Sequence, residues 1–229
     1  MPPAAPPLLE LDDASVVLGS SHRVLDHLNL TVAVGEHTAL LGPNGSGKSS
    51  LIKLLTRELW PLRHADERPP VRLFGQARWN VFDLRRQLGI LSPELDHRFV
   101  ESGVLGLEAV ISGFFASQGL WHHRVTAAME ASARAALERL GVAHLAEQPL
   151  DAMSCGEARR ILIARALVHE PVALLLDEPT TGLDLVARRQ FLETLRQLAH
   201  DGTTILMVTH HVEEIIPEIE HLAPLVNMI

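Results

Sequence analysis

Short, nearly continuous apolar runs alternate with stretches of helical periodicity along much of the chain. The runs 38–41 (TALL), 172–177 (VALLLD) and 203–209 (TTILMVT) show no polar alternation, which is typical of strands buried on both faces of a parallel sheet. The segment 48–59 places leucines and an isoleucine on one side of a predicted helix that ends before Pro61. Repeated strand–helix units of this kind predict an α/β core.

The region from residue 102 to residue 152 has a different character. It is rich in alanine, leucine and glutamate, it lacks strand-like runs, and its stretch RVTAAMEASARAALERL consists largely of strong helix formers. We therefore expect a single domain over 1–229, in which a helical subdomain at about 96–157 is inserted into a core formed by about 8–95 and 158–229.

Composition and charge narrow the class of protein. Of the 229 residues, 47% are apolar and 21% are charged, as in ordinary soluble proteins. The net charge of −8 gives no electrostatic reason to expect a direct nucleic-acid partner. The single cysteine, Cys155, cannot form an internal disulfide, which favours a reducing compartment. The most apolar region, 104–121, contains Glu108 and three glycines and is too interrupted to span a bilayer, so a membrane role would require a partner.

The stretch from Gly42 to Ser50, GPNGSGKSS, lies between a predicted strand and a predicted helix. It fits the pattern G-x-x-x-x-G-K-[ST], whose glycines let successive backbone N–H groups converge on a phosphate. The N-terminus of the following helix adds partial positive charge. We predict that Lys48 reaches the outer phosphates of a nucleotide and that Ser49 holds Mg²⁺.

Two carboxylates, Asp177 and Glu178, stand at the end of the apolar run ALLLDEP. A carboxylate at the C-terminal end of a strand in an α/β protein points into the crevice where ligands bind. We predict that Asp177 takes Mg²⁺ through water and that Glu178 polarises the attacking water as general base. Taken alone, the pair is equally compatible with two solvated acids at the start of a loop; the phosphate loop favours the catalytic interpretation.

A third motif opens the helical stretch MSCGEARRILIARAL. Ser154 and Glu157 fit the capping box S-x-x-E at a helix N-terminus. Ser154 and Gly156 would also form a second anion site there. One chain rarely needs two such sites for one phosphate unless two chains face each other.

Four motifs in this order resemble the ATP-binding cassette (ABC) family, and in particular the ATP-binding subunit of its transporters. GPNGSGKSS matches the family's phosphate loop, and MSCGE resembles its signature LSGGQ. LLLDEPTTGLD matches its metal-binding strand, catalytic glutamate and D-loop, and VTHH matches its switch histidine. The resemblance extends from about Leu8 to about His221. It implies a P-loop NTPase core with a mixed sheet flanked by helices, an inserted helical subdomain, and an ATPase that uses ATP and Mg²⁺.

The resemblance also implies a head-to-tail dimer in which two copies of the chain enclose two ATP molecules. Ser154, Gly156 and Glu157 of one copy would close the site of the other, and Asp184 would lie at the interface. His210 would contact the γ-phosphate and hold Glu178 and the water, so the expected catalytic residues are Glu178, His210 and Lys48. The phosphate-binding residues implied are Gly42, Pro43, Asn44, Gly45, Ser46, Gly47, Lys48, Ser49 and Ser50.

The chain departs from the family pattern in three places. The family stacks adenine on an aromatic residue near the N-terminus, where this chain offers Leu18 or His22; GTP use therefore stays open. Pro93 stands where the family has a metal-contacting glutamine, so Glu94 becomes a candidate metal ligand. The alternative is a loop that only links the helical region. The end HLAPLVNMI, from His221, is shorter than the further strand and hairpin with which family members continue.

Three functions follow from these features. We expect an ATPase subunit that drives a transmembrane permease and is located in the cytoplasm, on the cytoplasmic face of the membrane. The alternative is a soluble ABC-type ATPase without a permease, acting on a protein, ribosome or nucleic-acid complex. Such members carry tandem cassettes, coiled coils or zinc insertions, which this sequence lacks. A third possibility is a regulatory nucleotide-binding module with little turnover, but such a module needs neither Glu178 nor His210.

Overall fold

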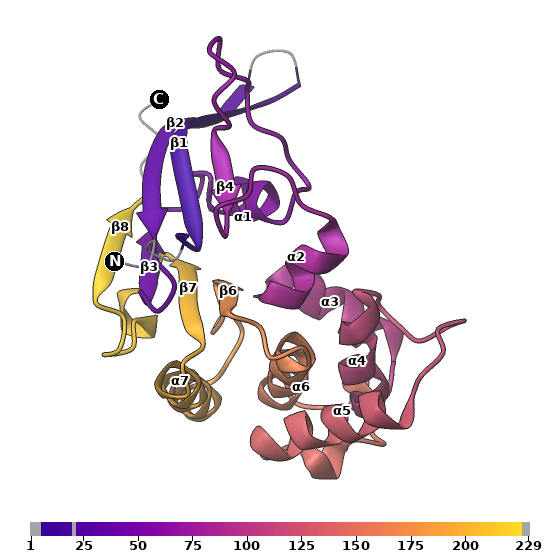
Figure 1. Ribbon diagram of the computed structural model, residues 1–229. Helices are drawn as coiled ribbons and strands as arrows, with labels where there is room; N and C mark the ends of the chain where they lie inside the picture. Colours follow the sequence, from indigo (N-terminus) through magenta and orange to yellow (C-terminus); the bar gives the residue numbers. More distant parts are fainter. Residues whose placement is uncertain (1–5, 20–21, 226–229) are drawn as a thin grey trace, which may run out of the picture.

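The chain forms two sheets, one parallel and one antiparallel, and its helices pack around them (Figure 1). The computed structural model describes residues 6–19 and 22–225. The parallel sheet has the strand order β5-β6-β7-β3-β8, and the antiparallel sheet has the order β2-β1-β4. The family resemblance implied one mixed sheet. In the structure, the parallel and the antiparallel strands form two separate sheets.

The strands are β1 (Leu9–Leu18), β2 (His22–Val32), β3 (Thr38–Leu41), β4 (Val71–Leu73), β5 (Leu88–Leu91), β6 (Ala173–Asp177), β7 (Thr204–Thr209) and β8 (His221–Pro224). The α-helices are α1 (Lys48–Leu55), α2 (Val81–Gln87), α3 (Pro93–Ser102), α4 (Gly106–Ser112), α5 (Ala127–Arg139), α6 (Cys155–Leu167) and α7 (Leu185–His200). Short 3₁₀ turns are η1 (Gly113–Phe115), η2 (Ala143–Leu145), η3 (Leu150–Ala152) and η4 (Val212–Glu214).

The parallel sheet separates two hydrophobic cores. Leu174 and Leu176 of β6 enter the core that α6 and α7 cover, whereas Ala173 and Leu175 enter the core formed with α1 and the antiparallel sheet. Every residue of β6 and β7 is buried. The predicted α/β fold with strands covered on both faces is therefore confirmed.

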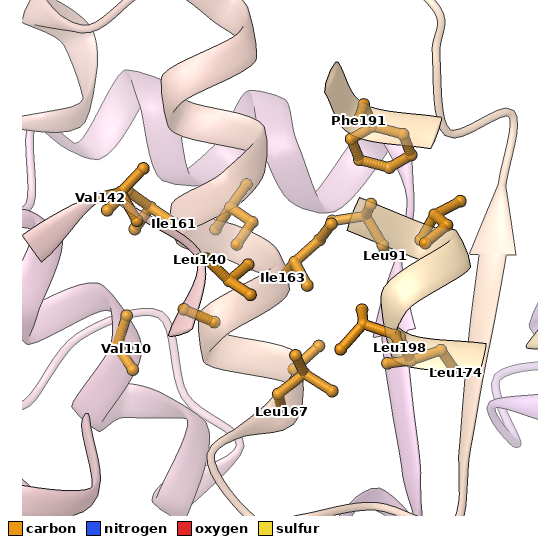
Figure 2. Packing of buried hydrophobic residues seen from close by; sticks show 14 of the residues in the cluster. Leu91, Val110, Leu140, Val142, Ile161, Ile163, Leu167, Leu174, Phe191 and Leu198 are labelled. Carbon is orange, nitrogen blue, oxygen red and sulfur yellow. The ribbon is translucent and has the colours of Figure 1, made fainter. Parts of the chain in front are cut away.

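Helix α6 joins the parallel sheet to the helical layer. Most of its residues are buried, as expected for a helix with neighbours on all sides. Figure 2 shows side chains of this shared core, namely Leu91 and Leu174 from the sheet, Ile161, Ile163 and Leu167 from α6, Phe191 and Leu198 from α7, Val110 from α4, and Leu140 and Val142 after α5. The domain boundaries expected near 95 and 157 fall within α3 and α6, and the division into core and subdomain stays a prediction.

The ends of three elements differ from their sequence-based bounds. The helix predicted over 48–59 ends at Leu55, because Thr56 caps it and Arg57 has a φ of 64° that no α-helix accommodates. A further strand does form near the C-terminus, since β8 pairs in parallel with β3. The last part of the stretch HLAPLVNMI, 226–229, lies outside the described residues. Pro93, expected in a loop, begins α3.

The apolar region 104–121 does not form one long helix. It is divided into α4, the turn η1 and a following loop. Across 6–19 and 22–225, no helix combines the length and the apolar character that crossing a bilayer requires.

Candidate functional site

The predicted site residues emerge from three neighbouring strands at one edge of the parallel sheet. Leu41 at the end of β3 lies opposite Thr209 at the end of β7, and Asp177 at the end of β6 lies opposite the residue before Thr209. The phosphate loop, Glu178 and His210 follow these three strands directly. They therefore meet at the edge where α/β proteins bind ligands.

The phosphate loop approaches its own backbone and the C-terminal segment closely. A Cβ atom on Gly42 would lie 2.4 Å from Ser46 Oγ and 2.5 Å from the carbonyl oxygen of Leu225, so only glycine fits there. Gly47 stands at the N-cap of α1 with a φ of 92°, a conformation that side chains disfavour. These two glycines therefore permit the close packing of the loop at the start of α1.

Two groups in the loop fit a bound anion. The Ser46 hydroxyl is buried, with the residue 6% exposed, and residues 6–19 and 22–225 give it no hydrogen-bond partner. Gly47 leaves the N-terminus of α1 without a side-chain cap. A buried hydroxyl without a partner is costly, and an uncapped helix N-terminus carries unpaired N–H groups with partial positive charge. A phosphate would satisfy both.

The ammonium of Lys48 lies between the loop and the carboxylate of Glu178. Its Nζ donates hydrogen bonds of 3.0 Å to the carbonyl oxygens of Gly42 and Pro43. The same nitrogen lies 3.5 Å from Glu178 Oε1. The structure therefore brings together Lys48 and Glu178, which are 130 residues apart in the chain.

Glu178 and His210 are in direct contact. His210 Nδ1 lies 2.9 Å from Glu178 Oε1. Glu178 has a φ of 42°, and its backbone N–H donates to the carbonyl of Val208 at 2.8 Å. A non-glycine residue in this left-handed region costs about 1 kcal/mol or more and persists where the surroundings enforce it, most often at functional sites. All three predicted catalytic residues thus meet at one point.

Asp177 is buried beside this group. Burial, followed by the neighbouring charge of Glu178, raises the pKa of Asp177 to about 6, although the Lys48 ammonium opposes the shift. A cation in the adjoining cavity would favour the ionised form of Asp177.

Two cavities adjoin these residues. One of about 260 Å³ extends from the phosphate loop and Glu178 to the start of β2, where His22 lines it. Leu18, the other candidate for packing the base, is not among its lining residues. A second cavity of about 330 Å³ is lined by Ser49, Glu94, Asp177 and Glu178. The three candidate metal ligands therefore share one cavity.

Pro93 and Glu94 form the first turn of α3. Ser92 caps this helix by accepting a hydrogen bond of 3.3 Å from the N–H of Leu95. Proline is well suited to the position after the cap, because its missing N–H needs no partner there. Glu94 pairs with Arg98 one turn later and its side chain is 54% exposed. The position of Pro93 is therefore explained by the helix start, and Glu94 lines the second cavity while paired with Arg98.

Mg²⁺ is compatible with the oxygen atoms at the second cavity. Mg²⁺ prefers oxygen ligands and is usually bound by one or two protein groups together with substrate phosphates. Ser49 and Asp177 supply such groups. In the part of the chain that the structure describes, no three His, Cys, Asp or Glu side chains lie close enough to bind a metal by themselves.

The signature residues form a second group. Ser154 and Glu157 make the predicted capping box, with the N–H of Glu157 donating to Ser154 Oγ at 3.3 Å and the N–H of Ser154 donating to Glu157 Oε2 at 2.9 Å. The Ser154 hydroxyl also donates to Glu157 Oε2 at 2.7 Å, and this bond, followed by the one from the Ser154 N–H, lowers the pKa of Glu157. Gly156 faces Ala187 of α7, and Asp184 caps the same helix by accepting from the N–H of Ala187 at 2.8 Å. None of these residues lines either cavity described above.

Comparison with known proteins decides the family. A family model described as "ABC transporter" matches residues 25–181. A putative ABC transporter ATP-binding protein of Streptococcus mutans is 35% identical over 202 residues, which cover 87% of this chain and 75% of that protein. The uncharacterized ABC transporter ATP-binding protein YlmA of Bacillus subtilis is 35% identical over 214 residues, covering 92% of this chain and 78% of that protein. The chain belongs to the ABC transporter family.

The fold agrees with this assignment. The structure of cbiO1 from Clostridium perfringens, part of the ABC transporter complex cbiONQ, has a TM-score of 0.76 and 24% identity, covering 96% of this chain and 84% of that one. The ABC protein described here is thus an ATP-binding subunit of a transporter and an ATPase. The alternative of a soluble ATPase without a permease is not favoured.

Sequence reasoning missed two buried charged residues beside the site of this ABC subunit. Glu214 is fully buried and accepts hydrogen bonds from the hydroxyls of Thr180 and Thr209. It therefore links the segment after Glu178 to the end of β7. Arg159, in α6, contacts the same segment from the other side. No motif marks either residue, because their importance depends on contacts between distant segments.

We predict that Asp177→Asn stabilises the nucleotide-free and metal-free ABC subunit at about pH 8, by about 1–2 kcal/mol, because the amide carries no charge to desolvate. A carboxyl whose pKa is raised in the fold stabilises the fold below its unfolded pKa, and this contribution is lost as the pH rises through about 6. The advantage of the variant should therefore shrink as the pH falls toward about 4. Urea denaturation in EDTA at a series of pH values measures it.

Asp201→Asn is the matched control. Asp201 is exposed, and its hydrogen bonds to Gln197 and Arg139 lower its pKa, so its replacement should give no gain at any pH. A gain for Asp177→Asn that did not change with pH would contradict the assigned cause.

Proposed function

We propose that two copies of this ABC subunit enclose two ATP molecules head to tail and hydrolyse them with Glu178 as general base, and that this cycle drives a membrane permease. The observation that carries the proposal is the meeting of Lys48, Glu178 and His210 at the cavity beside the phosphate loop.

The phosphates would lie on the loop from Gly42 to Ser50. Its backbone N–H groups and the N-terminus of α1 supply hydrogen bonds and partial positive charge. The Ser46 hydroxyl would gain the partner that it lacks. Lys48 would exchange its bonds to the loop carbonyls for the outer phosphates, and the base would lie toward His22, where the same cavity ends.

Mg²⁺ would be held by Ser49 and by Asp177 through water, with Glu94 as a further candidate at the same cavity. When bound, the ion would neutralise charge on the phosphate oxygens. Positive charge in this cavity also offsets the burial of Asp177 and keeps its carboxylate ionised.

Glu178 would accept a proton from the attacking water. The water oxygen forms a bond to the γ-phosphorus while the bond from that phosphorus to the bridging oxygen of ADP breaks, and the water proton moves to the carboxylate. His210, 2.9 Å from Glu178 Oε1, would hold the carboxylate and contact the γ-phosphate. Lys48 would stabilise the negative charge on the transferred group.

A second copy of the chain would complete each site. Ser154, Gly156 and Glu157 line neither of the two cavities at the phosphate loop, and Ser154 is exposed. The phosphate loop of one copy and the signature residues of the other would bind the phosphates from opposite sides. Asp184 would lie at the interface between the copies. ATP then joins the two copies, and hydrolysis separates them.

We predict that Glu178→Gln binds ATP without hydrolysing it and accumulates as a dimer. Glutamine keeps the shape of the side chain but cannot accept the proton, so the ATP that joins the two copies persists. Sizing chromatography with light scattering, with and without ATP and Mg²⁺, measures the mass.

Glu193→Gln, at an exposed glutamate of α7, serves as the control and should behave as wild type. Addition of Lys48→Ala to Glu178→Gln should abolish the dimer. A Glu178→Gln chain that stayed monomeric at saturating ATP would contradict the shared site.

The proposed permease would contact a groove of about 220 Å³ between α2, α3, η1 and α6. Arg85 and Arg165 line it, and burial together with the charge of Arg85 lowers the pKa of Arg165 to about 10. Among the described residues, neither arginine has a carboxylate within 4.0 Å. The two acids at the groove, Glu58 and Glu94, are bonded to Thr56 and Arg98. Arg165 is engaged with Ser112 and Ser117. Among the described residues, Arg85 donates only to the carbonyl of Ala116, so its remaining donors would fit an acidic segment of a partner.

This partner would place the subunit on the cytoplasmic face of the membrane, and no direct nucleic-acid partner is proposed. We expect tagged Glu178→Gln chain with ATP to retain a multi-span membrane protein from detergent-solubilised membranes of its own cells. Adding Arg85→Glu should reduce the amount of membrane protein recovered at least about tenfold, because the new carboxylate would repel an acidic segment of the partner.

Arg139→Glu is the control, since Arg139 pairs with Asp201 at the surface away from the groove. Recovery of a soluble complex instead of a membrane protein would contradict the permease. Equal recovery with Arg85→Glu would contradict the groove as its binding surface.

A further inference from the structure

Arg159 lies buried in the second turn of α6, between three segments of the ABC subunit. Its side chain is 5% exposed. Its Nη1 donates to the carbonyl of Pro179 at 2.8 Å, and its Nη2 donates to the carbonyl of Thr181 at 3.2 Å. Its Nε lies 2.7 Å from Asp96 Oδ2 of α3. One guanidinium thus joins α6, α3 and the segment that follows Glu178.

The segment after Glu178 is held from both sides. Arg159 donates to the carbonyl groups of Pro179 and Thr181, and Glu214 accepts from the Thr180 hydroxyl. Glu178 itself has a φ of 42°, which requires support from its surroundings. Residues 179–181 are the nearest backbone that can give this support on the C-terminal side.

Asp96 fixes the guanidinium in turn. Its side chain is 13% exposed, and Arg159 is the cation that the described residues place within 4.0 Å of it. A buried carboxylate without a cation is costly, so each partner of this pair requires the other. Arginine presents several donors in a rigid planar fork, which suits two carbonyl acceptors on one segment and a carboxylate on another; lysine presents a single point charge.

We propose that Arg159 is a positioning residue for ATP hydrolysis, which holds residues 179–181 and through them the Glu178 carboxylate, and that Asp96 fixes Arg159 in this place. The inference rests on the proposed role of Glu178. It gives α3 a mechanical connection to the hydrolytic site, since α3 carries Asp96 and, in its first turn, Glu94 at the second cavity.

The loss of Arg159 should affect turnover rather than nucleotide binding. Among the described residues, the phosphate loop and His22 make no hydrogen bond or ion pair with Arg159, so the affinity for ATP should change by no more than about twofold in Arg159→Gln. A small displacement of the general base can lower a rate about 100-fold, and we expect kcat to fall by about 10- to 100-fold. Arg159→Lys should recover part of the loss, because lysine reaches one of the three acceptors.

The experiment measures kcat and KM for ATP hydrolysis, and binding of a fluorescent ATP analogue, in Arg159→Gln, Arg159→Lys and Asp96→Asn. Because removal of one partner of a buried pair destabilises a fold, Asp96→Asn/Arg159→Met removes both charges with similar volume and serves as the fold-safe variant. Arg139→Gln is the matched control, as it removes an exposed arginine–aspartate pair between two other helices.

The expected result is a lower kcat with retained ATP affinity in Arg159→Gln and in the double variant, partial recovery in Arg159→Lys, and no change in Arg139→Gln. Wild-type kcat in the folded double variant would overturn the inference. A parallel loss of ATP affinity would overturn it as well, because it would indicate a general structural role. Activity that survived in Glu178→Gln would overturn the proposed function itself, whatever the Arg159 variants show.

Discussion

The register of three parallel strands is the constraint on which the site depends. The pairing of β3 with β7 and of β6 with β7 sets the phosphate loop, Glu178 and His210 side by side. A shift of one residue in the β6–β7 ladder would turn the alternating side chains of β6 into the wrong core, because the two faces of this sheet belong to different hydrophobic clusters. The packing that stabilises the sheet therefore also sets the distances between Lys48, Glu178 and His210.

Several features of the site lower the stability of the isolated fold and favour ligand binding. Asp177 is buried with a raised pKa, Glu178 has a strained backbone, and the Ser46 hydroxyl lacks a partner. A magnesium ion and a triphosphate would relieve the first and the third. Such local conflicts are expected where a protein binds and transforms a ligand rather than where it only packs.

The sequence predicted the parts of this structure that depend on local pattern. The continuous apolar runs identified β3, β6 and β7, and GPNGSGKSS identified the loop before α1. The capping box at Ser154 could also be predicted, because it joins residues three positions apart. Pro93 has its explanation only in the structure, where it follows the Ser92 cap. The contacts of Arg159 and Glu214 could not be predicted, since they join segments whose proximity is a property of the tertiary fold.

Mixing two inactive variants tests whether each hydrolytic site is shared between two chains, as proposed. Lys48→Ala disables the phosphate loop, whereas Ser154→Asp places a negative charge against the phosphates and still caps α6, because aspartate is a good N-cap residue. Each variant alone should be inactive, and ATPase activity of a 1:1 mixture is the measurement. In a head-to-tail dimer, a mixed pair keeps one site with an intact loop and an intact signature, so the mixture should recover about a quarter of the wild-type rate. A mixture no more active than either variant alone would contradict the shared site.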